Sequence, residues 1–98
     1  MSNTDPLVQL SDWYARHCDG EWEHTYGIKI DTLDNPGWSV CVDQHGTELE
    51  TRELESIHLD EGEMNWMTCV KANSVFKGTG DPAKLSKIIQ AFLRFSLA

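Results

Sequence analysis

Histidine and cysteine are the residue types in this chain that could hold a metal ion or activate a nucleophile. The chain has four histidines and three cysteines, Cys18, Cys41 and Cys69. A structural zinc site takes its ligands in close pairs, such as C-x2-C or H-x3-H. His17 and Cys18 are adjacent and His24 follows further on, which matches neither pattern. We therefore expect no metal and no other cofactor.

Cys18 is the candidate for a catalytic nucleophile, because His17, Asp19 and His24 lie near it in the sequence. Thiol catalysis places the sulfur beside a base and orients that base with a third group. Cys18 also continues the apolar stripe of an expected helix, which is typical of a small core residue. A small thiol-dependent or sulfur-transferring enzyme is thus the alternative function, and the primary expectation is a protein without catalytic residues.

The charge of the chain is strongly acidic and unevenly distributed. Sixteen acidic residues face eight basic ones, which gives a net charge of -8. Residues 1–63 hold 15 acids and three bases, whereas residues 64–98 hold one acid and five bases. Nucleic-acid-binding proteins normally carry a basic patch, so we expect no nucleic acid partner. An acidic surface suits a basic protein partner and speeds its approach, although excess acid also simply keeps a small protein soluble.

The length of 98 residues predicts a single domain over residues 1–98. The composition, 40% hydrophobic and 24% charged, is typical of a globular protein, and every apolar stretch is too short to span a membrane. The first ten residues, MSNTDPLVQL, have neither the basic nor the apolar region of a secretory signal. Together with the odd number of cysteines, this predicts a cytoplasmic protein with free thiols.

Two Asp-Pro pairs predict the starts of two helices, because aspartate caps a helix and proline suits its first position. Asp5-Pro6 precedes an apolar stripe, so we expect a helix at about residues 5–19. Asp81-Pro82 precedes a second stripe, so we expect another helix at about residues 82–96. The stripe of the first helix consists of Leu7, Leu10, Tyr14 and Cys18.

Apolar and polar residues alternate in the region between these helices, which predicts strands. Residues 22–31 are expected to form one long strand, with His24 on its buried face. Asp34–Gly37 is typical of a turn, so residues 38–43 would complete a hairpin. Further strands are expected near 55–60, 66–71 and 75–77.

The expected order of helix, five strands and helix defines the fold class as α+β. Because the strand connections are short, we expect successive strands to be antiparallel neighbours in one sheet. The N-terminal and C-terminal helices would cover one face of that sheet. An uncovered edge or face could then pair two copies of the chain, so the oligomeric state stays open.

Four tryptophans are many for a chain of this length. Core packing is their usual role, but tryptophan also anchors protein interfaces. Trp22 lies among Asp19, Glu21 and Glu23 at the expected start of a strand. We interpret Trp22 as an exposed aromatic anchor surrounded by acids, suited to a basic partner.

The segment from Cys18 to Trp38 reads CDGEWEHTYGIKIDTLDNPGW. It resembles the central motif of the immunity protein 53 family of bacterial polymorphic toxin systems. The preceding pair Trp13-Tyr14 and the later segment Gly80–Pro82 agree with that family as well. The resemblance therefore covers nearly the whole chain, and Cys41 and Cys69 are the features that depart from it.

The resemblance implies a protein that binds a cognate toxin in the cytoplasm of the producing cell and blocks it. Some relatives carry a sulfurtransferase label, which is the alternative centred on Cys18. Toxins of these systems are often nucleases and therefore basic, so the implied partner is a basic protein. The motif residues could equally be structural, with Asp34–Gly37 making a turn and Trp38 filling the core. The predicted partner-binding residues are Glu21, Trp22, Glu23, Asp31, Asp34, Trp38 and Asp43.

Overall fold

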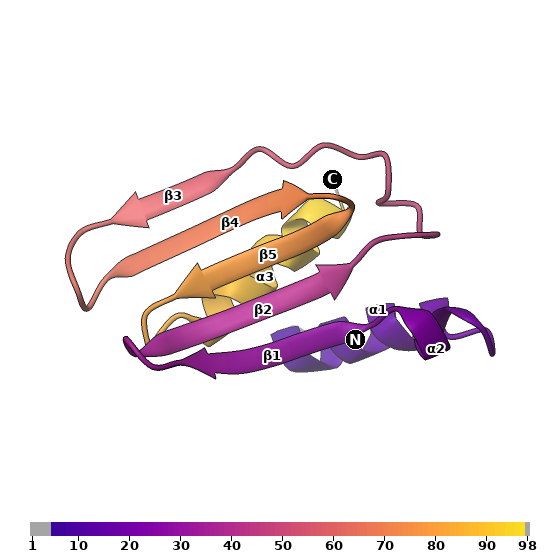
Figure 1. Ribbon diagram of the computed structural model, residues 1–98, viewed down its shortest axis with the longest axis horizontal. Helices are drawn as coiled ribbons and strands as arrows, with labels where there is room; N and C mark the ends of the chain where they lie inside the picture. Colours follow the sequence, from indigo (N-terminus) through magenta and orange to yellow (C-terminus); the bar gives the residue numbers. More distant parts are fainter. Residues whose placement is uncertain (1–4, 98) are drawn as a thin grey trace.

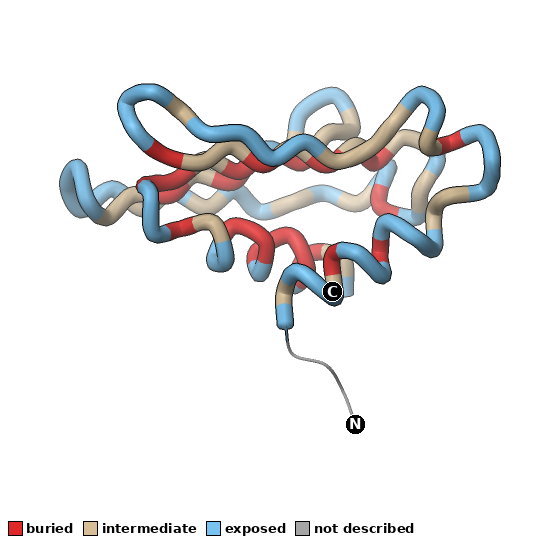
Figure 2. The backbone as a smooth tube through the Cα atoms, turned by 90° about the horizontal axis from the view of Figure 1, so that it is seen from below, coloured by how far each residue is buried: buried red, intermediate tan, exposed pale blue. Residues whose placement is uncertain are grey.

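The computed structural model describes residues 5–97 and has an α+β fold, as the sequence predicts. One sheet of five antiparallel strands carries two long helices on a single face, and its other face is uncovered (Figures 1 and 2). Within the described residues no helix is long and apolar enough to cross a membrane. The elements are α1 (Pro6–His17), α2 (Trp22–Thr25), β1 (Ile28–Leu33), β2 (Gly37–Asp43), β3 (Ile57–Asp60), β4 (Trp66–Ala72), β5 (Val75–Gly80) and α3 (Leu85–Leu97).

The strand order across the sheet is β1-β2-β5-β4-β3. The hairpins β1–β2, β3–β4 and β4–β5 join neighbouring strands as predicted, and the turn at Asn73 and Ser74 has the positive φ angles of a tight hairpin. The expectation that β2 and β3 are neighbours is wrong. β2 pairs with β5 instead, so β5 lies at the centre of the sheet and residues 44–56 carry the chain to the far edge.

Two basic side chains hold this long connection in place. The ammonium group of Lys71 donates to the backbone oxygens of Leu49 at 2.8 Å, Glu50 at 2.9 Å and Arg52. The guanidinium group of Arg52 donates in turn to the carbonyl oxygens of Phe95 and Ser96 in the last turn of α3. Leu49 is fully buried between these anchors. Polar bonds from β4 and α3 therefore replace strand pairing in this stretch.

Helix α1 is capped by Asp5, whose carboxylate accepts a hydrogen bond from the backbone nitrogen of Leu7 at 3.0 Å. Its buried residues are Leu10 and Trp13, so the buried face is rotated from the predicted stripe. Tyr14 is 37% exposed and Leu7 is 54% exposed. The rotation follows from the size of the Trp13 ring, which packs edge-on against other aromatic rings of the core.

Residues 22–25 form one helical turn rather than the start of a long strand, which corrects the sequence prediction. The carboxylate of Asp19 accepts hydrogen bonds from the backbone nitrogens of Glu21 and Trp22, both at 2.9 Å. Gly20 has φ +93°, a left-handed conformation that glycine adopts easily. These local bonds favour a turn over an extended strand. As a consequence His24 is exposed, not buried as expected.

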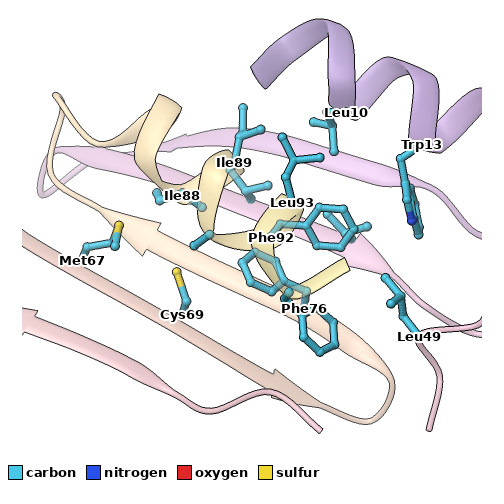
Figure 3. Packing of buried hydrophobic residues seen from close by; sticks show 14 of the residues in the cluster. Leu10, Trp13, Leu49, Met67, Cys69, Phe76, Ile88, Ile89, Phe92 and Leu93 are labelled. Atoms are coloured by element: carbon cyan, nitrogen blue, oxygen red, sulfur yellow. The ribbon is translucent and has the colours of Figure 1, made fainter. Parts of the chain in front are cut away.

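The core lies between the sheet and the two long helices (Figure 3). β5 places Phe76, Gly78 and Gly80 on this face, and the glycines leave room for α3. A Cβ atom on Gly78 would meet the Ile88 side chain well inside contact distance, and one on Gly80 would lie 2.7 Å from Lys84 Cβ. The helix therefore packs close to the backbone of the central strand.

The substitution Gly78→Ala should destabilise the fold by about 1–3 kcal/mol, because the added methyl group must push α3 away from β5. The matched control is Gly27→Ala, since a Cβ atom there has no neighbour within 4 Å and the φ angle of Gly27 is not positive. Urea unfolding of both variants measures the difference. Equal stability of the two variants would contradict the close packing of α3.

Asp81 joins the end of β5, the start of β4 and the lead-in to α3. One carboxylate oxygen accepts from the Lys84 ammonium at 2.7 Å and from the backbone nitrogen of Trp66 at 2.9 Å, and the other accepts from Ala83 N at 2.9 Å. Asp81 is 1% exposed and Lys84 is 6% exposed, so this ion pair is buried. Asp81 was predicted to cap the second helix, but α3 begins at Leu85 and the carboxylate instead binds β4.

The stability of the fold should fall in acid as Asp81 is protonated. The hydrogen bond from Lys84 holds the pKa of the Asp81 carboxyl at about 2, below the value of about 3.9 for an unfolded chain. The contribution of this lowered pKa is complete above about pH 4 and disappears as the pH falls towards 2. Asp81→Asn should be less stable at neutral pH and lose less further stability between pH 4 and pH 2.

Thermal unfolding across this pH range, with Asp34→Asn at an exposed turn position as control, tests the assignment. An Asp81→Asn curve parallel to that of the unmodified protein would mean that another carboxylate carries the acid dependence.

Candidate partner-binding surface

The predicted partner-binding residues lie at opposite ends of β1, which is the edge strand of the sheet (Figure 1). A strand of six residues separates its ends by roughly 17–20 Å. The structure therefore does not bring the seven residues into one site. Glu21, Trp22 and Glu23 lie at α2 with Asp43 near the start of β1, whereas Asp31, Asp34 and Trp38 lie towards or beyond the other end.

Trp22 is 8% exposed, so the prediction of an exposed aromatic anchor is wrong. Its indole nitrogen donates to the carbonyl oxygen of His45 at 2.7 Å, and its ring contacts those of Trp13 and Tyr26. The helical turn of α2 directs this ring into the core. The acids beside it in the sequence therefore do not surround an exposed aromatic group.

Glu23 closes the loop in front of α2. Its carboxylate accepts from the backbone nitrogen of Asp19 at 3.0 Å and from that of Gly20 at 2.8 Å. Hydrogen bonds from backbone nitrogens lower the pKa of Glu23, because they stabilise the charged form. Glu23 thus serves the loop, whereas Glu21 is the exposed acid of this group.

Asp43 and Trp38 also make bonds that join elements of the fold. The Asp43 carboxylate accepts from Gly27 N at 3.0 Å, while Asp43 N donates to Gly27 O at 3.0 Å. The indole nitrogen of Trp38 donates to the carbonyl oxygen of Pro82 at 3.0 Å. Both side chains are half-buried. Asp43 therefore locks the start of the β1–β2 pairing, and Trp38 ties β2 to the segment before α3.

The remaining predicted acids, Asp31 and Asp34, are exposed and lie at the end of the sheet that holds the β1–β2 turn. The β3–β4 turn lies at the same end (Figure 1). It adds three exposed acids, so both hairpins contribute negative charge to one side of the molecule. We call this group the acidic end, and its members are Asp31, Asp34, Asp60, Glu61 and Glu63.

Two apolar side chains accompany the acidic end. Met64, in the β3–β4 turn, is 80% exposed. Trp66 is half-buried and is the cross-strand partner of Asp60. Because residues alternate between the faces and Met67 faces the helices, Trp66 lies on the uncovered face. An aromatic group next to exposed acids is thus present, contributed by β4 and not by α2.

The sequence prediction misses the acids of the β3–β4 turn and Trp66, because it assigns this stretch only to the strands near 55–60 and 66–71 and their connection. A usable signal was the local charge, since residues 50–63 hold six acids and one base. All six acids are exposed, and the base, Arg52, is bonded to α3. Lys71 and Lys84 are also occupied by internal partners. Within residues 50–63 the exposed formal charge is therefore carried by acids alone.

The thiol alternative depends on a base beside Cys18, and the imidazole next to it in the sequence, that of His17, bonds other groups. His17 Nδ1 bonds the carbonyl oxygen of Trp13 at 2.7 Å, and Nε2 bonds the Glu48 carboxylate at 2.8 Å. Both ring nitrogens of His17 are therefore occupied by groups other than Cys18. The bond from His17 lowers the pKa of Glu48. Cys18 itself donates to the carbonyl oxygen of Tyr14 at 3.3 Å.

The other cysteines are placed differently. Cys69 is fully buried, and burial raises the pKa of its thiol to about 11. Cys41 is half-buried on the uncovered face. Across residues 5–97, no three histidine, cysteine, aspartate or glutamate side chains come together as a possible metal site.

A thiol reagent should modify Cys18 and Cys41 in the folded protein but reach Cys69 only after unfolding, because Cys69 is buried and protonated. Mass spectrometry of digests taken during the reaction measures each site, and Cys69→Ser serves as control. We expect no rate enhancement at Cys18 over a peptide thiol. A greatly enhanced rate at Cys18 near neutral pH would contradict this and support the thiol alternative.

Comparison with known protein families gives a match for this chain. The family model described as immunity protein 53 matches residues 7–96, which includes every element of the fold except the first residue of α1 and the last of α3. No curated protein and no solved structure matches. The match covers well over half of the chain and agrees with the motif between Cys18 and Trp38. The chain belongs to the immunity protein 53 family, and is therefore an immunity protein against a toxin.

Proposed function

We propose that this protein neutralises a cognate toxin domain by stoichiometric binding in the cytoplasm, without catalysis, and that the acidic end is the surface that binds. Family membership supports a toxin as the partner. The position of His17, whose ring nitrogens bond Trp13 and Glu48 and not Cys18, supports a role without thiol catalysis. The observation that carries the choice of surface is the convergence of two acidic hairpins on one end of the sheet.

A basic toxin, such as a nuclease, fits this surface. β1 and β3 are the two edges of the sheet, roughly 19 Å apart across four strand spacings, and they carry Asp31 and Asp60. That separation is within the width of an ordinary protein interface. Fixed carboxylates across such a width would attract a basic cleft and raise the association rate. They would also occupy the positions of nucleic acid phosphates in a nuclease.

The roles of the seven residues predicted from the sequence divide accordingly. Asp31 and Asp34 belong to the proposed surface, with Trp66 in place of Trp22 as the aromatic contact. The bonds of Glu23, Trp38 and Asp43 support structural roles for these side chains. Glu21 is exposed at the opposite end of the sheet and stays a prediction for a separate contact.

Reversing charges at the acidic end should slow association with the toxin encoded next to this gene. We expect the double variant Asp34→Lys/Glu63→Lys to reduce the association rate constant roughly tenfold at low salt, with a smaller effect at high salt. Stopped-flow or surface-based kinetics with purified, inactivated toxin measures this rate.

The matched control is Glu50→Lys/Glu53→Lys, which changes the net charge equally at exposed positions outside the acidic end and outside the predicted contacts. It should have a much smaller effect on association. Equal slowing by both variants would show that overall charge, not this surface, governs association. Full-rate binding by Asp34→Lys/Glu63→Lys would place the interface elsewhere, and failure of the unmodified protein to suppress toxicity would overturn the proposed function.

A further inference from the structure

The outer side of β1 is an unpaired strand edge within the described chain, because β1 pairs only with β2. The backbone nitrogen of Asp43 donates to the carbonyl oxygen of Gly27, so these two residues form a hydrogen-bonded pair. This pair lies next to the pair of Ile28 and Val42 in the β1–β2 ladder. Such pairs alternate along an antiparallel ladder, so Lys29 and Asp31 bond to β2. Ile28, Ile30 and Thr32 therefore direct their N–H and C=O groups away from β2, where they could form hydrogen bonds with another strand.

We propose that two copies of this chain pair through β1, antiparallel about a twofold axis at Ile30, to form one continuous ten-stranded sheet. In this register Ile30 lies opposite Ile30 of the second copy, and Ile28 lies opposite Thr32. These are the residues whose backbone groups point outward, so the pairing satisfies both edges at once. The helices of both copies then lie on the same face of the sheet.

Charge complementarity selects this register. Lys29 and Asp31 project from the uncovered face, and pairing about Ile30 places Lys29 of each copy opposite Asp31 of the other. The neighbouring allowed registers, with the axis at residue 29 or residue 31, would place lysine opposite lysine or aspartate opposite aspartate. Like charges directly opposite each other are unfavourable. The sequence of β1 is thus complementary to itself in one arrangement.

Exposed apolar side chains lie on the other face of the same edge. Ile30 is 39% exposed although it is in phase with the buried Val40, because no strand within residues 5–97 pairs with its outer side. A shallow groove between α1 and the start of β1, with a volume of about 290 Å³, is lined by Leu10, Tyr14 and Ile28 among others. Pairing about Ile30 would bring the two Ile30 side chains together beside these grooves and remove them from water.

The opposite edge of the sheet has the features of an edge that avoids pairing. β3 has only four residues, and it is flanked by Glu53, Glu55, Glu61 and Glu63, all exposed. If two copies paired through β3, their glutamates would lie close to one another, and the repulsion between these like charges opposes such pairing. β1 has six residues and balanced charge instead. This contrast favours β1 as the edge that accepts a second copy.

Sedimentation equilibrium of the purified protein, without toxin, tests the proposal. We expect a dimer of twice the 11.1 kDa chain mass over a concentration series. Lys29→Asp, which sets one aspartate opposite another across the axis, should raise the dissociation constant at least about tenfold. Asp31→Lys should do the same by setting lysine opposite lysine. The double variant Lys29→Asp/Asp31→Lys restores opposite charges across the axis and should recover the dimer.

Lys77→Asp is the matched control, because Lys77 lies on the same uncovered face in a central strand. It should leave the dissociation constant unchanged, and circular dichroism verifies that each variant is folded. A monomer at all concentrations would overturn the proposal, as would a double variant no better than the single ones. A dimer insensitive to residues 29 and 31 but reduced by Lys77→Asp would indicate pairing through the uncovered face, and would equally overturn it.

Asp31 belongs to both proposed surfaces, but the two tests are separate: self-association is measured without the toxin, and the association test changes Asp34 and Glu63. A monomer that still suppresses the toxin would remove the dimer alone. A dimer that fails to suppress it would remove the toxin-binding role alone.

Discussion

The buried ion pair between Asp81 and Lys84 is the point on which the architecture depends. Asp81 bonds the backbone of β4, and the same residue ends β5 and leads into α3. A carboxylate in this buried position is tolerated because an ammonium group and two backbone N–H groups surround it. The Asp81–Lys84 ion pair orients α3 over the central strand β5, where Gly78 and Gly80 allow close packing. Trp38 adds a bond to the neighbouring Pro82 from β2.

Trp22, Glu23 and Asp43, which the sequence marks as candidate partner contacts, each make contacts within the fold. Trp22 fills the core, Glu23 closes a loop, and Asp43 fastens the start of a hairpin. Under the proposed function, these bonds would maintain the scaffold while exposed residues contact the toxin. The exposed acids of the two hairpins lie on that scaffold without bonds to the core, so they can change without loss of the fold.

The two edges of the sheet differ in physical character, and the connection of residues 44–56 creates this difference. It carries the chain past β5 and β4, so an acidic strand occupies one edge and a charge-balanced strand the other. Lys71 and Arg52 hold the connection in place, because their charged groups donate hydrogen bonds to backbone oxygens. Within residues 50–63 the six acids are exposed, whereas the one base, Arg52, is bonded to α3.

Much of the fold followed from local sequence signals. Asp5-Pro6 marked α1, Asp34–Gly37 marked a hairpin turn, and alternation marked β2 and β4, because caps, turns and strand periodicity depend on nearby residues. The α2 turn, the placement of β5 between β2 and β4, and the burial of Trp22 depended on tertiary contacts. The acidic end could be suspected from composition, and the strand order decides that its two hairpins lie at the two edges of the sheet. Local propensity cannot specify which distant strands pair, since that choice depends on burial and on bonds between residues far apart in sequence.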